Sequence, residues 1–122
     1  MTKGKILIID DDNRNIFALS AVLKARKYEC LSATSAEDGL YLLKQNRDIA
    51  VVLMDMMMPG MDGYQAMAKM REDEVLSGIP VIAVTAQAMV GDRERCLEAG
   101  AVGYVSKPIN VDTLTSLLTK YI

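Results

Sequence analysis

Five residues of the sequence combine the carboxylate, hydroxyl and ammonium groups that phosphoryl transfer requires: Asp10, Asp11, Asp55, Thr85 and Lys107. A carboxylate needs no base to activate it as a nucleophile, because it is already ionised near neutral pH. An ammonium group can neutralise one phosphoryl oxygen, and a hydroxyl group can donate a hydrogen bond to another. Carboxylates that lie close together repel one another, and Mg²⁺, which prefers oxygen ligands, relieves that repulsion. These residue types therefore predict metal-assisted phosphoryl transfer, provided that they meet in space.

Each of the five residues has a distinct predicted part in this chemistry. Asp55 is the predicted phosphoacceptor, and Thr85 and Lys107 are predicted to act on the phosphoryl oxygens. Asp10, Asp11 and Asp55 are the predicted ligands of Mg²⁺ or Mn²⁺. The sequence contains no histidine, which removes the usual general base and any nucleophile pair that depends on one. A carboxylate nucleophile requires neither a general base nor a histidine partner, so the predicted mechanism is compatible with the lack of histidine.

The acidic run that begins at Asp10 also has a structural interpretation. It could form a turn that caps the following helix, and Asp12 or Asn13 suits the capping position. The third aspartate leaves another choice open, because Asp11 and Asp12 could form the metal pair instead of Asp10 and Asp11. We prefer Asp10 and Asp11, since they directly follow the apolar residues 6–9.

The spacing of apolar residues predicts five strands that alternate with five helices. The strands are expected at 5–9, 28–32, 49–54, 81–84 and 102–105. The helices are expected at 13 to about 27, 35–46, 62 to about 76, about 89–98 and from about 110 onward. Ser35 and Asp62 are the expected N-caps of the second and third helices, and Gly100 is expected to end the fourth.

Strands and helices in alternation predict a parallel sheet with helices on both faces. We expect a doubly wound α/β fold of the (βα)₅ type, with strand order 2-1-3-4-5, and one domain over residues 1–122. In this order the first and third strands are neighbours, which places Asp55 beside Asp10 and Asp11. Thr85 and Lys107 follow other strands at the same edge, where open α/β sheets bind their ligands.

The composition argues against several other classes of protein. The formal net charge is −2 and the pI is about 5.1, and no basic cluster is present that would bind nucleic acid or anionic lipid. The apolar runs are far too short to span a bilayer, and the N-terminus has no signal-peptide pattern, so we expect a cytoplasmic protein without membrane contact. Cys30 and Cys96 lack metal-ligand spacing and are expected to be buried thiols.

Over essentially its whole length, the sequence resembles the receiver domain of two-component response regulators. The resemblance rests on several short motifs in the same order and at closely similar separations. These are the apolar strand ending at Asp10 and Asp11, Asp55 within its apolar run followed by Pro59, Gly60 and Gly63, the pair Thr85 and Ala86, Tyr104, and the pair Lys107 and Pro108. One such motif alone is a weak signal, whereas five in register are highly specific.

The resemblance implies a part for each matching residue. Asp55 would be the phosphorylated residue, Asp11 would ligate Mg²⁺ directly, and Asp10 would contribute through water or by its charge. The backbone carbonyl of Met57 would be the third protein ligand. Three residues would have structural parts, Pro59 and Gly60 in a turn and Pro108 after a cis peptide bond.

The resemblance also implies a conformational switch. Thr85 would move toward the phosphoryl group, and Tyr104 would turn inward to fill the vacated space. The phosphodonor would be a phosphohistidine on a histidine kinase or a histidine phosphotransfer domain, or a small acyl phosphate. A downstream protein would then bind the face formed by the fourth helix, the fifth strand and the fifth helix. Such a domain catalyses only its own phosphorylation and dephosphorylation and is not otherwise an enzyme.

Two other functions compete with this interpretation. A Mg²⁺-dependent phosphatase with an aspartate nucleophile generally has a second acid two positions later, where this sequence has Met57. A constitutive protein-interaction module would not require Asp11, Asp55, Thr85 and Lys107 together. Both a stand-alone regulator and a receiver within a larger protein are compatible with the sequence.

Overall fold

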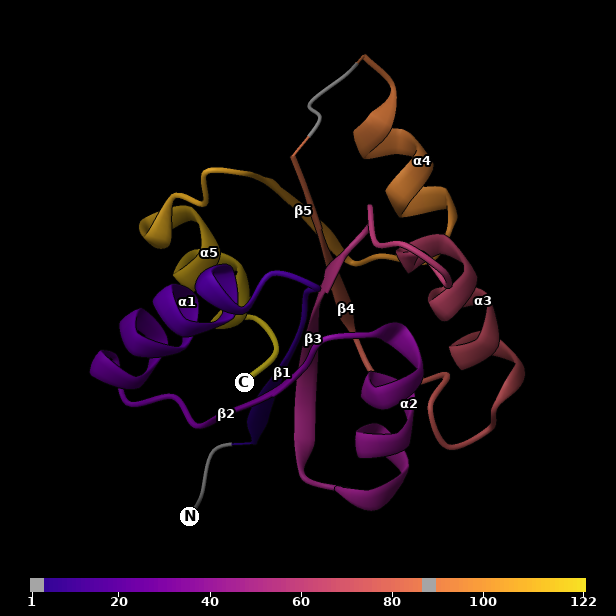
Figure 1. Ribbon diagram of the computed structural model, residues 1–122, viewed down its shortest axis with the longest axis horizontal. Coiled ribbons are helices and arrows are strands. Elements are labelled where there is room, and N and C mark those ends of the chain that lie inside the picture. The colour runs from indigo at the N-terminus through magenta and orange to yellow at the C-terminus, as the bar shows by residue number, and fades with distance from the viewer. Residues whose placement is uncertain (1–3, 87–89) are drawn as a thin grey trace.

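The computed structural model describes residues 4–86 and 90–122, in which strands and helices alternate (Figure 1). The strands are β1 (Lys5–Ile9), β2 (Cys30–Ala33), β3 (Ile49–Asp55), β4 (Val81–Thr85) and β5 (Gly103–Ser106). The helices are α1 (Asn13–Ala25), α2 (Ala36–Gln45), α3 (Gly63–Glu72), α4 (Asp92–Glu98) and α5 (Val111–Leu118). In the part of the chain that the structure describes, none of the helices is long and apolar enough to cross a membrane.

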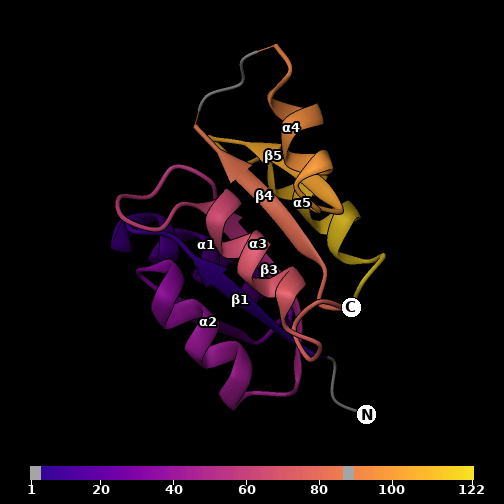
Figure 2. The ribbon, with the colours of Figure 1, turned by 90° about the vertical axis from the view of Figure 1, so that its right-hand side faces the viewer.

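The five strands form one parallel sheet in the order β2-β1-β3-β4-β5. Helices α1 and α5 cover one face of this sheet, and α2, α3 and α4 cover the other (Figures 1 and 2). The predicted α/β class, parallel sheet and strand order are therefore confirmed. The sheet is parallel because each strand is followed by a helix that returns the chain to the starting edge.

Side chains that alternate along the central strands form two separate cores, one beneath each helical layer. This follows from strand geometry, because successive side chains point to opposite faces. Beneath α2, α3 and α4 lie Leu7, Ile9, Val52, Met54 and Ala83, together with Leu43, Met67 and Cys96 from the helices. Beneath α1 and α5 lie Ile6, Ile8, Val51, Leu53 and Ile82, together with Leu23, Leu114 and Leu118. The continuous apolar runs thus reflect strands that are buried on both faces.

Two helices begin at the capping residues that the sequence predicts, Ser35 and Asp62, and Asn110 caps a third near its predicted start. The Ser35 side chain accepts a hydrogen bond from the backbone nitrogen of Asp38 at 3.2 Å. Asp62 and Gln65 form a full capping box, in which each side chain accepts from the other residue's backbone nitrogen. At α5, the Asn110 side chain accepts from the backbone nitrogen of Thr113 at 3.0 Å. Local side-chain chemistry fixes these boundaries.

Several predicted boundaries were wrong by two to four residues. Helix α1 ends at Ala25 rather than about 27, because Lys27 adopts a left-handed conformation with φ of 71°. Helix α3 ends at Glu72 rather than about 76, because the extended Asp73 accepts hydrogen bonds from the next turn of the chain. Helix α4 begins at Asp92, after Gly91 with φ of 91°. Its expected start at Met89 lies outside the described residues.

Candidate functional site

Three neighbouring strands carry buried polar residues at their carboxyl ends. Among the described residues, the polar or charged side chains that are buried belong to Asp10, Asp55 and Thr85, which are 5%, 5% and 4% exposed. They directly follow β1, end β3 and end β4, three adjacent strands of the sheet. Burying a charge is costly unless a partner compensates it. The concentration of these groups at one edge therefore marks a site.

The strand register brings the first two of these residues to the same level. Ile9 pairs with Met54 across β1 and β3, so that the next residues along the two strands are Asp10 and Asp55. Asp55 in turn pairs with Val84 on β4, which places Thr85 one residue further along. The predicted convergence of the residues that follow these strands is thus a direct result of parallel pairing.

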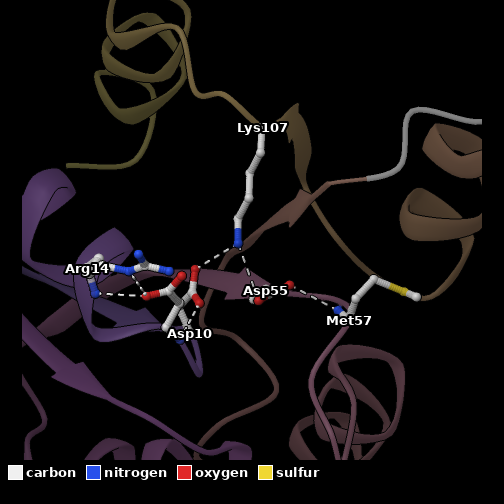
Figure 3. Close-up of polar contacts among 6 residues, drawn as sticks. Asp10, Arg14, Asp55, Met57 and Lys107 are labelled. Atoms are coloured by element: carbon white, nitrogen blue, oxygen red, sulfur yellow. Dashed lines mark hydrogen bonds and ion pairs between the residues drawn. The ribbon is translucent and has the colours of Figure 1, made fainter.

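Lys107 reaches this edge from the loop after β5. Its backbone nitrogen donates a hydrogen bond to the carbonyl oxygen of Thr85 at 2.7 Å. Its Nζ lies 3.0 Å from Oδ2 of Asp10 and 3.4 Å from Oδ2 of Asp55, so that one ammonium group bridges two carboxylates (Figure 3). The peptide bond between Lys107 and Pro108 is cis, as the resemblance implied.

The carboxylates of Asp10, Asp11 and Asp55 form a cluster that suits a hard cation. Each offers an oxygen, and these oxygens lie within 4.8 Å of one another. Asp10 and Asp55 are buried, whereas Asp11 is exposed. Among the described residues, the Lys107 ammonium contacts Asp10 and Asp55, and its one positive charge does not balance the three carboxylates of the cluster. That donor set fits Mg²⁺ or Mn²⁺, which take carboxylate oxygens.

Asp12 lies outside this cluster and acts as the N-cap of α1. Its side chain accepts a hydrogen bond from the backbone nitrogen of Arg14 at 2.9 Å. Its own backbone nitrogen donates to Oδ1 of Asp10, also at 2.9 Å. The acidic run therefore combines both interpretations of the sequence, because Asp10 and Asp11 join Asp55 while Asp12 caps the helix.

The surroundings of Asp55 disfavour its ionised form in the absence of a cation. Burial raises the pKa of the Asp55 carboxyl, and the nearby charge of Asp10 raises it further. A hydrogen bond of 3.0 Å from the backbone nitrogen of Met57, together with the Lys107 ammonium, acts in the opposite direction without cancelling the rise. Partial burial lowers the pKa of Lys107, but hydrogen bonding and charge from Asp10 and Asp55 outweigh it, so that pKa is raised overall. The site therefore stabilises the protonated, positively charged form of Lys107 and destabilises the ionised form of Asp55.

The other predicted site residues lie on the loop that follows Asp55 and on β5. The Met57 side chain is 55% exposed beside the acceptor, and its backbone nitrogen is already bonded to Asp55. Gly60 has φ of 74°, the left-handed conformation that a type II turn after Pro59 requires at that position. Tyr104 lies on β5, half-buried and packed against the core beneath α2, α3 and α4.

A cavity beside the site was not predicted. It has a volume of about 220 Å³ and extends from Asp10, Asp55 and Lys107 along the inner side of α1, where Ala18 and Leu19 line it. Its wall is mainly apolar. A cavity depends on how the helices pack on the sheet, so the pattern of residues along one helix cannot predict it.

Comparison with known proteins identifies the family. The model of the response regulator receiver domain matches residues 6–119. The chain belongs to the response regulator receiver family. Members of this family are signalling regulators, and the fold described above is the one expected for them. The predicted family is therefore confirmed.

Two curated relatives illustrate the range of proteins in which similar domains occur. Protein PilH of Pseudomonas aeruginosa is 37% identical over 91% of this chain and 91% of its own length. Sensor histidine kinase RcsC of Escherichia coli is 38% identical over 95% of this chain, but the matching region is only 12% of RcsC. The chain thus spans nearly all of one relative and about an eighth of the other.

One solved structure bears on the acidic cluster. It is the receiver domain of a sensor histidine kinase from Pseudomonas aeruginosa, with a magnesium ion coordinated in its active-site cleft. This structure is 31% identical to the chain, covers 98% of each sequence and has a TM-score of 0.87. The carboxylate cluster of Asp10, Asp11 and Asp55 agrees with the acidic pocket in which receiver domains bind Mg²⁺.

Proposed function

We propose that the chain is a phosphorylation-dependent switch that accepts a phosphoryl group on Asp55. The observation that carries the proposal is the buried Asp55 carboxylate, with the Lys107 ammonium 3.4 Å away and two further carboxylates beside it. Nucleophile, cation and metal-binding oxygens are thereby gathered within one small edge of the sheet. That is the set of groups on which phosphoryl transfer depends.

In the proposed transfer, an oxygen of Asp55 forms a bond to phosphorus as the bond between phosphorus and the donor atom breaks. The electron pair of the broken bond leaves with the donor, which is a phosphohistidine nitrogen of a histidine kinase or phosphotransfer domain, or an oxygen of a small acyl phosphate. Lys107 neutralises one phosphoryl oxygen, and the Thr85 hydroxyl donates to another. Mg²⁺ held by Asp10, Asp11, Asp55 and the Met57 carbonyl would supply further charge neutralisation.

Phosphorylation adds about −1.5 to −2 charges beside Thr85 and Lys107. We infer that this charge draws Thr85 inward, that Tyr104 follows, and that the surface formed by α4, β5 and α5 changes. Tyr104 is suitably placed, because it lies on β5 with part of its ring exposed. Leu97 on α4 and Val102 before β5 are 39% and 40% exposed and offer apolar contact to a downstream protein.

The direct test is intact-mass analysis of the purified chain after incubation with acetyl phosphate and Mg²⁺. We expect a mass gain of one phosphoryl group, lost when Mg²⁺ is replaced by a chelator. Asp55→Asn should gain nothing, whereas the exposed Asp38→Asn should gain it like the original chain. Equal labelling of Asp55→Asn, or none of the original chain, contradicts the proposal.

A further inference from the structure

Helix α4 has little local stability of its own. It contains seven residues, from Asp92 to Glu98, and isolated helices this short are marginal in water. Its N-cap is Gly91, which has no side chain to accept a hydrogen bond from the first turn. The position of α4 on the sheet must therefore depend on contacts with its neighbours.

Two side chains of α3 hold α4 at successive turns. The Tyr64 hydroxyl lies 3.6 Å from Sγ of Cys96, in hydrogen-bonding contact. One turn further along α4, Nη1 of Arg71 donates to the carbonyl oxygen of Ala99 at 2.8 Å and so satisfies a carbonyl at the C-terminal end of the helix. Contact at two points restricts both the rotation and the sliding of α4 against α3. We call Tyr64 and Arg71 the α3 clamp; α3 and α4 lie on the same face of the sheet (Figure 2).

Helix α4 also contributes to this contact. The Arg95 guanidinium lies over the Tyr64 ring, 5.1 Å from its centroid, within the range of a cation–π interaction. The Cys96 side chain beneath is only 1% exposed. Burial, with the contact to Cys96 next, raises the pKa of Tyr64 to about 12, so its hydroxyl remains protonated at neutral pH.

The N-terminal end of α3 contacts the acceptor segment, residues 55 and 56. Gly63, the first residue of α3, donates its backbone hydrogen bond to the carbonyl oxygen of Met56 at 3.4 Å. A Cβ atom on Gly63 would lie 2.8 Å from Cα of Met56 and 3.1 Å from the carbonyl oxygen of Asp55, so the two backbones are in close contact. A contiguous chain of contacts therefore links Asp55 through α3 to α4. This chain of contacts runs through α3, whereas the proposed switch pair Thr85 and Tyr104 lies on β4 and β5.

We propose that the α3 clamp holds α4 in its unphosphorylated position and thereby opposes the switch. This inference rests on the proposed function, since it concerns the same acceptor. Tyr64 and Arg71 are positioning residues in this account, because they touch neither the acceptor carboxylate nor the metal-binding oxygens. Contacts made in one of two conformations favour that conformation, so their removal shifts the population toward the other. A phosphoryl analogue that selects the switched conformation must then bind more tightly.

The test compares the affinity for beryllofluoride, in the presence of Mg²⁺, of the original chain and of two clamp variants. Arg71→Met removes the hydrogen bond to Ala99 and retains an unbranched side chain, while Tyr64→Phe removes only the hydroxyl. Lys69→Met is the matched control, because it removes one positive charge from an exposed position on the same helix. Titration followed by nuclear magnetic resonance gives the affinity of each folded variant.

We expect each clamp variant to bind beryllofluoride roughly two- to tenfold more tightly, the factor by which one such contact changes an equilibrium. Amide hydrogen exchange in α4 should also become faster in both variants, and neither effect should appear in Lys69→Met. Unchanged or weaker affinity in both clamp variants, with normal binding by the original chain, overturns the clamp and leaves the proposed function intact. Failure of the original chain to bind overturns both.

Discussion

The Nζ of Lys107 lies 3.0 Å from Oδ2 of Asp10, closer than it lies to the predicted acceptor. The lysine thus pairs with the buried carboxylate of Asp10, which is not the proposed phosphoacceptor, and still lies 3.4 Å from Asp55. Both acids are almost completely buried, so neither could keep its charge cheaply without this ammonium group. One residue thereby serves stability and the proposed chemistry together.

Replacement of Lys107 by methionine should destabilise the chain at neutral pH. The variant leaves two buried carboxylates facing each other, and we expect the free energy of unfolding to fall by about 1–3 kcal/mol. Lys44→Met is the control, since Lys44 is 60% exposed and lies 3.8 Å from Asp73, and its loss should cost below about 0.5 kcal/mol. Urea unfolding at pH 7 measures both, and equal costs for the two variants would contradict the prediction.

The sign of the pH dependence follows from the same pair of acids. Folding raises the pKa of Lys107 above its ordinary 10.5, so its stabilising contribution is present at lower pH and is lost as the pH rises through the folded value. The loss of stability in Lys107→Met should also shrink as the pH falls toward about 4, because Asp55, whose pKa burial raises, becomes protonated and no longer repels Asp10. If the difference in free energy of unfolding between the original chain and Lys107→Met grew as the pH fell, the lysine would not act by compensating these carboxylates.

Asp55→Asn should stabilise the chain when no divalent cation is present. Burial raises the pKa of Asp55, so its ionisation costs stability once the pH exceeds the folded value, and the cost is absent below the unfolded pKa. We expect a gain of about 1 kcal/mol at pH 7, a common size for one substitution, and no gain at about pH 3. Thermal unfolding at both pH values tests this, with Asp38→Asn as the exposed control.

Strand positions and caps were predictable because short-range chemistry decides them. Ser35, Asp62 and Asn110 each bond to a backbone nitrogen three residues later, so their effect can be inferred from the sequence alone. Continuous apolar runs likewise identify strands that both helical layers bury. Once the strand order is known, parallel pairing brings Asp10 and Asp55 together without further information.

Other features have no recognisable signal in the local sequence. The end of α1 is set by Lys27 in a left-handed conformation, which bulky residues seldom adopt. The sequence predicted that Lys107 would approach the acceptor, but the shorter distance to Asp10 results from the path of the chain after β5. The contact between Tyr64 and Cys96 joins residues 32 positions apart, and only the packing of α3 beside α4 creates it.

Gly63→Ala should disturb the acceptor segment in particular. Its new Cβ would lie within 2.8 Å of the Met56 backbone, so that segment must shift, at a cost of about 1–3 kcal/mol in stability. Labelling by acetyl phosphate should slow as well, because Asp55 precedes the displaced residue. Gly78→Ala is the matched control, since a Cβ there meets nothing within 4 Å and should change stability by at most about 1 kcal/mol. Equal behaviour of the two variants in both assays would be evidence against a close approach at Gly63.

Cys30 should react slowly with thiol reagents although it is only partly buried. Burial, with the charge of Glu29 adding to it, raises the pKa of the Cys30 thiol to about 11, and only the thiolate reacts. Alkylation at pH 8 should therefore be about a hundredfold slower than for an ordinary exposed cysteine and should rise roughly tenfold per pH unit. Cys96 is buried and should remain unmodified in the folded chain. Mass spectrometry of iodoacetamide-treated protein, with Cys96→Ala used to isolate the first thiol, follows both reactions. A rate at Cys30 that levels off near pH 8.5 would show that its surroundings do not suppress ionisation.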